Sequence, residues 1–161
     1  MRVLLLLALI VLMQGCQYDP HAQLYTTEKP QLSDIVGRYK LTSQSVTRDG
    51  LSVMQGRSCF IELRADGTFS ATNVPPLLLN TIHSPDANFF STLVSGSGTW
   101  TLADVGGVSD GTTVKTHWGV DLDSAVGNFL PVGLSGHKPP YGLIYTLGDP
   151  DEGMVLILDR N

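Results

Sequence analysis

Residues 59–73 read Cys59-Phe60-Ile61-Glu62-Leu63-Arg64-Ala65-Asp66-Gly67-Thr68-Phe69-Ser70-Ala71-Thr72-Asn73, and this stretch decides the fold class. Every second side chain is apolar on either side of Asp66-Gly67, and a period of two is typical of a strand with one buried face. Asp-Gly between two alternating runs is the strongest short signal for a β-hairpin. The stretch therefore predicts two antiparallel strands joined by a tight turn.

The same period recurs along the chain, and long helical periodicity is nearly absent, which argues against an α/β fold. Several short strands joined by turns are typical of an antiparallel barrel or sandwich. The other strands are expected at 35–42, Gly98–Leu102, Thr113–Leu122, Asn128–Leu134, Tyr141–Leu147 and Met154–Asp159.

One segment, at about 75–94, breaks the alternation. Ser84-Pro85-Asp86 is a good helix start, because it offers an N-cap oxygen, a preset first turn and a negative charge at the positive end of the helix dipole. Phe89, Phe90 and Leu93 would then share one face. We expect one or two short helices that either plug a barrel end or form a lid over a ligand cavity.

The N-terminus has the pattern of an export signal: a positive start at Met1-Arg2, an apolar run at Val3–Met13, and a small residue, Gly15, before Cys16. As a helix the apolar run would be ~16 Å long, about half of a hydrocarbon core. A cleaved signal peptide over residues 1–15 is therefore predicted, rather than a permanent span.

Leu12-Met13-Gln14-Gly15-Cys16 resembles the lipobox of bacterial lipoproteins. The resemblance implies that Cys16 receives a diacylglycerol, becomes the first mature residue and is acylated, with palmitate for example, on its amino group. Gln17 stands where an Asp would resemble an inner-membrane retention signal, so the periplasmic side of the outer membrane is expected if the host is Gram-negative. The rival interpretation is an ordinary secretory cut that leaves Cys16 as a free thiol.

Residues 16–31 are expected to form a lipidated tether, although Leu24 and Tyr25 could instead dock on the single β domain predicted over 32–161. Removal of residues 1–15 leaves nine basic and fifteen acidic side chains. An acidic chain without a basic run is not expected to bind nucleic acid.

Residues of catalytic or metal-binding types occur without the spacing that their chemistry needs. No pair among His21, His83, His117 and His137 has metal-ligand spacing, so neither a metal nor a cofactor is expected. Cys59 falls in the alternation of a strand and is interpreted as a buried, inert thiol. The nearest approach to a nucleophile elbow, at 133–137, ends in His137 where Gly is required. We expect a protein that is not an enzyme.

Gly98-Thr99-Trp100 and Val36-Gly37-Arg38-Tyr39 are similar to the motif that closes the barrel floor in lipocalin-like proteins. Together with Asp66-Gly67-Thr68-Phe69 and the 143–151 segment, they also resemble small bacterial lipoproteins. These resemblances bear on architecture and location only. The expected fold is all-β and antiparallel: an eight-stranded lipocalin-like barrel or half-barrel with a short helical insert.

Two main functional hypotheses follow from this pattern. The first is non-catalytic binding of a small, partly apolar ligand by aromatic side chains: Trp100, Trp118, Phe89, Phe90 and Tyr141. The second is a protein-interaction module of the cell envelope, an assembly factor or an enzyme inhibitor, that acts through the 135–141 loop and the acidic 149–152 connection. A hydrolase, which would need a Ser or Asp beside a His in a cleft, is a third.

Overall fold

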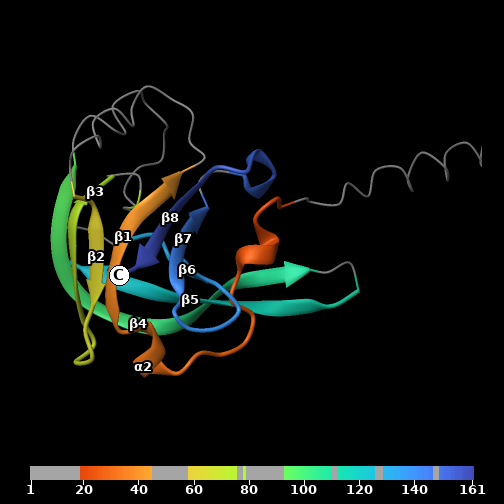
Figure 1. Ribbon diagram of the computed structural model, residues 1–161, viewed down its shortest axis with the longest axis horizontal. Coiled ribbons are helices and arrows are strands. Elements are labelled where there is room, and N and C mark those ends of the chain that lie inside the picture. The colour runs from red at the N-terminus through yellow and green to blue at the C-terminus, as the bar shows by residue number, and fades with distance from the viewer. Residues whose placement is uncertain are drawn as a thin grey trace, which may run out of the picture.

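A computed structural model describes residues 19–44, 58–75, 78, 93–109, 112–125, 129–146 and 149–161. Eight antiparallel strands follow one another around a closed ring, and β8 pairs with β1 (Figure 1). This is the up-and-down order of lipocalin barrels, so the predicted all-β fold is confirmed, with a closed barrel rather than a half-barrel or sandwich. The strands are β1 (Gly37–Gln44), β2 (Phe60–Leu63), β3 (Thr68–Val74), β4 (Val94–Ser109), β5 (Val114–Ser124), β6 (Val132–Ser135), β7 (Gly142–Thr146) and β8 (Val155–Arg160).

The hairpin predicted from residues 59–73 is present as β2 and β3. Leu63 pairs with Phe69, and the Gly67 amide donates to the Arg64 carbonyl in a turn whose φ of +79° at Gly67 suits glycine. Ile61, Leu63 and Phe69 are fully buried. The alternation in the sequence therefore identified the inward face correctly.

The barrel has two ends, which we name by the short helices beside them. The α2 end carries α2 (Leu32–Ile35), the β2–β3 turn, the 136–141 connection and the C-terminus. The η4 end carries the 3₁₀ turn η4 (Pro150–Glu152), Leu78 and the 125–131 connection. In Figure 1 the α2 end points down and the dark blue η4 turn lies at the top.

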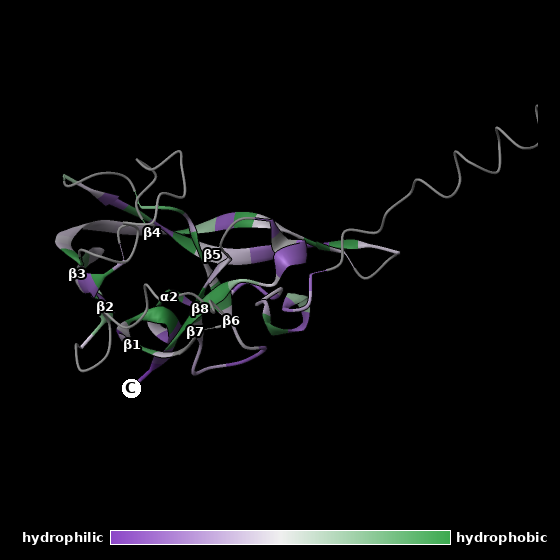
Figure 2. Cartoon of the chain, turned by 90° about the horizontal axis from the view of Figure 1, so that it is seen from above, coloured by the Kyte–Doolittle hydropathy of each residue, from purple (hydrophilic) through white to green (hydrophobic). Residues whose placement is uncertain are grey.

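Strand β4 is much longer than the Gly98–Leu102 that the sequence predicts. Beyond the barrel wall, Ala103–Ser109 of β4 pairs with Val114–Gly119 of β5, and this pair, here called the ribbon, projects from the barrel (Figure 1). Hydrophobic and hydrophilic residues are mixed along it, whereas the C-terminus is hydrophilic (Figure 2). The β5 half of the ribbon lies within the predicted strand Thr113–Leu122, whereas Ala103–Ser109 of β4 was missed, because Gly106-Gly107 and a register shift between Asp104 and Gly106 interrupt its alternation.

The prediction of a tether is wrong for residues 19–26, and the alternative of docking is confirmed. Tyr25 and Thr26 are buried, and η1 (Ala22–Leu24) precedes them. The Thr26 amide donates to the Leu134 carbonyl and the Trp118 amide to the Thr26 carbonyl, so this segment fills the gap where β5 leaves β6. We call residues 19–26 the strap.

The strap covers apolar residues on the outside of the barrel. Leu143 and Tyr145 of β7 pack inside, whereas Ile144, Val155 and Ile157 form a second cluster with Tyr25, Leu24 and Val108. Strands that are apolar on both faces must be buried on both faces. Docking of the strap follows from that requirement.

Most of the predicted insert at 75–94 lies outside the described residues, as do Cys16 and the signal segment. Within it, Leu78 is buried in the core and its carbonyl accepts a hydrogen bond from the Leu130 amide. The choice between a plug and a lid stays a prediction, because the rest of the insert lies outside the described residues. Over the described residues, no helix combines the length and the apolar character needed to cross a bilayer.

Gly98→Ala is expected to lower the free energy of unfolding by roughly 1–3 kcal/mol, as overpacking does. An added Cβ would lie 1.8 Å from the Asp123 carbonyl oxygen, which is backbone of the paired strand and cannot rotate away. Gly107→Ala on the same strand is the control, because its Cβ would lie 2.7 Å from the Val114 side chain, on the exposed ribbon, and at an ordinary contact distance of 3.9 Å from the Lys115 carbonyl oxygen. Urea denaturation measures both; equal losses would contradict the assigned register.

Candidate functional site

The interior of the barrel holds one polar atom without a partner, the hydroxyl oxygen of Tyr145. It is the only buried side-chain oxygen or nitrogen, among the residues described, that makes no hydrogen bond. Tyr145 lies on β7 opposite Leu156 of β8, and both side chains belong to the central core. Burying a hydroxyl without a partner costs about 1–3 kcal/mol, so this atom requires an explanation.

Cys59 is the second polar group in this part of the interior. Its thiol is free and buried, at the start of β2, as the sequence analysis expected. Burial raises the pKa of the Cys59 thiol to about 11. The pKa of Tyr145 is raised far above its usual value, mainly by burial and secondly by Cys59. Both groups are therefore neutral at pH 7 and both can donate a hydrogen bond.

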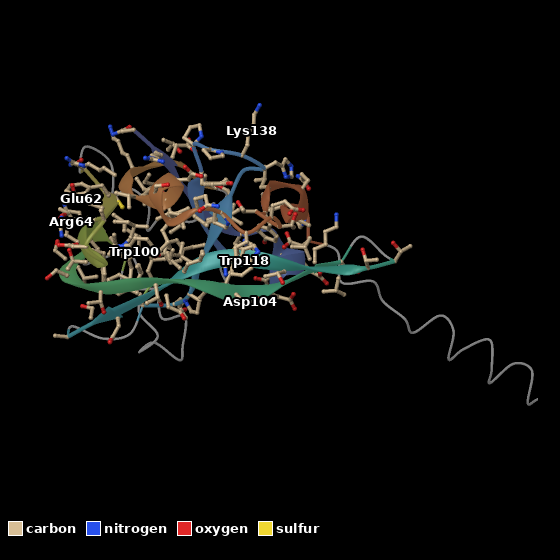
Figure 3. All side chains as sticks on the ribbon, turned by 90° about the horizontal axis from the view of Figure 1, so that it is seen from below. Glu62, Arg64, Trp100, Asp104, Trp118 and Lys138 are labelled. Atoms are coloured by element: carbon tan, nitrogen blue, oxygen red, sulfur yellow. The ribbon has the colours of Figure 1, made fainter. Side chains whose placement is uncertain are left out.

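Trp100 makes its hydrogen bonds at the α2 end of the barrel, away from Tyr145 and Cys59. Its amide donates to the Gly67 carbonyl and its indole Nε1–H donates to the Arg64 carbonyl, at 2.8 and 2.9 Å. Figure 3 shows it beside Glu62 and Arg64, whose side chains form an ion pair of 2.6 Å. Trp100 thus fastens the β2–β3 turn to β4, and its side chain is buried in the central core.

The other aromatic residues predicted to bind a ligand do not gather around Trp100. Trp118 lies farther along the hairpin, next to Asp104 (Figure 3), partly buried and with the Lys29 ammonium 5.0 Å from its ring centroid. Tyr141 is buried at the start of β7, and burial raises its pKa. Phe89 and Phe90 lie outside the described residues. The ligand-binding role of these five residues stays a prediction.

A second polar cluster lies outside the barrel wall, beneath the strap. The rings of Tyr25 and His117 stack with centroids 4.0 Å apart. The Tyr25 hydroxyl donates to Asp19 Oδ2 at 2.5 Å and lies 3.0 Å from Thr146 Oγ1. Burial, followed by the bond to Asp19, raises the pKa of Tyr25 to about 12.

His117 is held as a neutral ring in this cluster. Its Nε2 lies 3.2 Å from the Leu134 carbonyl oxygen, which can only accept, so Nε2 carries the proton. Burial lowers the pKa of His117 below its usual value, and the Leu134 carbonyl, Asp19 and Asp104 only partly offset that effect. Gly133 makes room for the ring, since a Cβ there would lie 2.4 Å from His117 Cε1.

Five further acidic residues in the described ranges are on the surface. Asp121 and Asp123 are exposed on one face of β5, and Asp149, Asp151 and Glu152 are exposed around η4. No three His, Cys, Asp or Glu side chains within the described ranges are grouped so as to hold a metal ion. The sequence analysis missed Tyr145, because a tyrosine that alternates with Leu143 has the pattern of ordinary core.

Comparison of the chain with protein-family models, with curated proteins and with solved structures found no match.

Acidification is expected to destabilise the native protein through His117. Its pKa is lower in the folded state, so between that value and about 6.5 the unfolded chain binds more protons and stability falls as the pH falls. His117→Phe keeps a ring against Tyr25 but cannot titrate. Chemical denaturation at pH 7.5 and pH 5.0 should show a smaller loss in His117→Phe than in the wild type.

The control for this experiment is His137→Phe, because His137 is exposed in the 136–141 connection. It should lose as much stability on acidification as the wild type. If His117→Phe behaves like His137→Phe, the assignment of a neutral, buried His117 is wrong.

Proposed function

We propose that this protein is a lipid-anchored protein of the bacterial cell envelope that binds a small, partly apolar ligand inside its barrel, without catalysing a reaction. The observation that carries the proposal is the Tyr145 hydroxyl, buried in the barrel interior with no hydrogen-bond partner among the described residues. Such a donor is available to an acceptor outside the chain, and this supports the proposal.

The surroundings of Tyr145 indicate the chemistry of this ligand. Core side chains from most of the strands are apolar, including Ile61, Leu143 and Leu156, so the body of the ligand would be apolar too. Eight-stranded barrels are just wide enough to be filled by side chains or to hold one small ligand. A carbonyl, ester or ether oxygen on that ligand would accept the Tyr145 proton.

The protonation states favour binding over catalysis. A nucleophilic cysteine needs a lowered pKa, whereas burial raises that of Cys59. A general base near neutral pH is equally absent among the described neighbours of Tyr145, and His117 lies on the other side of the wall, bonded to Leu134. The described interior therefore offers a bound molecule no activated group, which supports the proposal of binding without catalysis.

The proposed location depends on Cys16. The lipobox resemblance implies a diacylglycerol on this cysteine, and two or three acyl chains give a durable attachment where one gives a marginal one. We place the protein on the periplasmic side of the outer membrane if the host is Gram-negative. Mass analysis of the mature N-terminus tests this part directly.

A protein-interaction role is the second candidate, and the ribbon is the observation that favours it. β4 pairs with β3 only through Val94–Thr99. From Thr101 on, within the described residues, no neighbouring strand lies along the outer edge of β4. Such an edge can pair with an extended segment of another protein. Crosslinking in cells that captures one partner through the ribbon, from a barrel without ligand, would favour this candidate.

Native mass spectrometry of the protein purified in detergent from its own envelope tests the ligand directly. We expect a bound small molecule of defined mass, with a dissociation constant that rises about tenfold in Tyr145→Phe, which corresponds to one hydrogen bond of about 1.4 kcal/mol. A wild-type protein recovered without any bound molecule would contradict the proposal.

Two buried tyrosines give a matched pair for stability without ligand. The Tyr39 hydroxyl donates to the Ile35 carbonyl, whereas that of Tyr145 has no partner. Tyr39→Phe should lower the free energy of unfolding by about 1–2 kcal/mol, because the Ile35 carbonyl loses its donor. Tyr145→Phe should leave it unchanged or raise it by about 1 kcal/mol. Urea denaturation of protein freed of ligand measures both, and a large loss in Tyr145→Phe would mean that its hydroxyl has a partner in the folded chain.

A further inference from the structure

The start of the strap is fixed to the η4 end of the barrel. Asp19 Oδ2 accepts the Tyr25 hydroxyl, which also lies 3.0 Å from Thr146 Oγ1 at the end of β7. His21 Nε2 donates to the Gly153 carbonyl oxygen at 3.0 Å. The Asp19 position is therefore set by contacts on both sides of the β7–β8 connection, and the chain leaves the domain at the η4 end.

Very little chain separates this point from the proposed anchor. Cys16 and Asp19 are three residues apart, and a fully extended chain covers at most about 11 Å over that distance. The opposite end of the barrel is farther away, because the eight residues of β1 rise ~26 Å, or about 20 Å along the axis of a barrel with tilted strands. An anchor at Cys16 can hold the η4 end at the lipid surface but leaves the α2 end well above it.

We propose that the bilayer that carries the anchor is the surface on which the η4 end of the barrel rests. This inference rests on the proposed lipidation of Cys16. The α2 end, which carries Trp100 and the β2–β3 turn, then points away from the membrane. The strap is thus an orienting element and not a flexible spacer.

The charges of the η4 end determine whether its electrostatic interaction with a given lipid surface is repulsive. Asp149, Asp151 and Glu152 are exposed there. Within a Debye length, about 10 Å at 0.1 M salt, these carboxylates are repelled by anionic headgroups. Close contact is therefore expected on a zwitterionic surface, and on an anionic one only when salt screens the repulsion.

Fluorescence quenching on vesicles tests the orientation. The lipidated full-length protein is labelled at a new cysteine, Asp151→Cys at the η4 end or Ala65→Cys in the β2–β3 turn, and inserted into phosphatidylcholine vesicles that carry a headgroup quencher. Both positions are exposed, while Cys59 is buried with a raised pKa and resists labelling. We expect severalfold stronger quenching at position 151 than at 65. Equal quenching, or stronger quenching at 65, would overturn the proposal.

Two further measurements test separately whether the short connection sets the orientation and whether headgroup charge affects it. A twenty-residue Gly-Ser insertion after Tyr18 adds ~25 Å of average reach, so the difference between positions 151 and 65 should shrink. Persistence of the full difference would show that something other than the short connection sets the orientation, and would overturn the proposal. With anionic vesicles, quenching at 151 should rise with salt; a fall would overturn the predicted headgroup preference.

The same samples distinguish this proposal from the one on which it rests. If Cys16 carries no lipid, the protein does not stay with the vesicles, and the proposed anchoring has failed. If the protein stays bound but position 151 is not quenched, the anchoring holds and the orientation is wrong.

Discussion

Pairing between β1 and β8 is the interaction on which the rest of the structure depends. Lys40 faces Asp159 and Leu41 faces Leu158 across this seam, which turns an eight-stranded sheet into a ring with no open edge in its wall. Closure removes the interior from water. The raised pKa values of Cys59 and Tyr145 are consequences of that closure, because burial is the first cause of both.

Closure alone leaves the outer face of β7 and β8 to be covered. Ile144 and Val155 point away from the interior, and nothing in the ring itself can bury them. The strap supplies Leu24 and Tyr25, and the ribbon supplies Val108. The departure of β5 from β6 opens the gap that Thr26 fills, so the long hairpin and the docked N-terminal segment support each other.

The strands could be predicted from local sequence patterns, whereas the docking of the strap and the unpaired Tyr145 hydroxyl depend on long-range packing. Alternation with a period of two located strands such as β2 and β3, because a wall with one wet face imposes that period. Strands β6 and β7 are buried on both faces and were located as short runs between turns. The full length of β4 was not predicted because Gly106-Gly107 and a register shift interrupt the alternation in its distal half. Docking of the strap depends on the outer face of strands more than a hundred residues away in the chain. The partnerless Tyr145 hydroxyl is visible only when every neighbour is in place, since Leu143 and Tyr145 alternate as any pair of core residues would.

Neighbouring residues of β7 connect the interior to the strap. Tyr145 points inward with its free hydroxyl, and Thr146 lies beside the Tyr25 hydroxyl that fixes Asp19. The partnerless donor and the departure point of the anchor are therefore at the same end of the barrel, on opposite sides of one strand. Exposing apolar surface to water costs about 25 cal/mol per Å², so an apolar ligand is more stable in a bilayer or inside the barrel than in the water between them. If Cys16 carries the proposed lipid, the barrel is held by this end beside a bilayer, and the short connection between Cys16 and Asp19 keeps the two apolar environments of the proposed ligand next to each other.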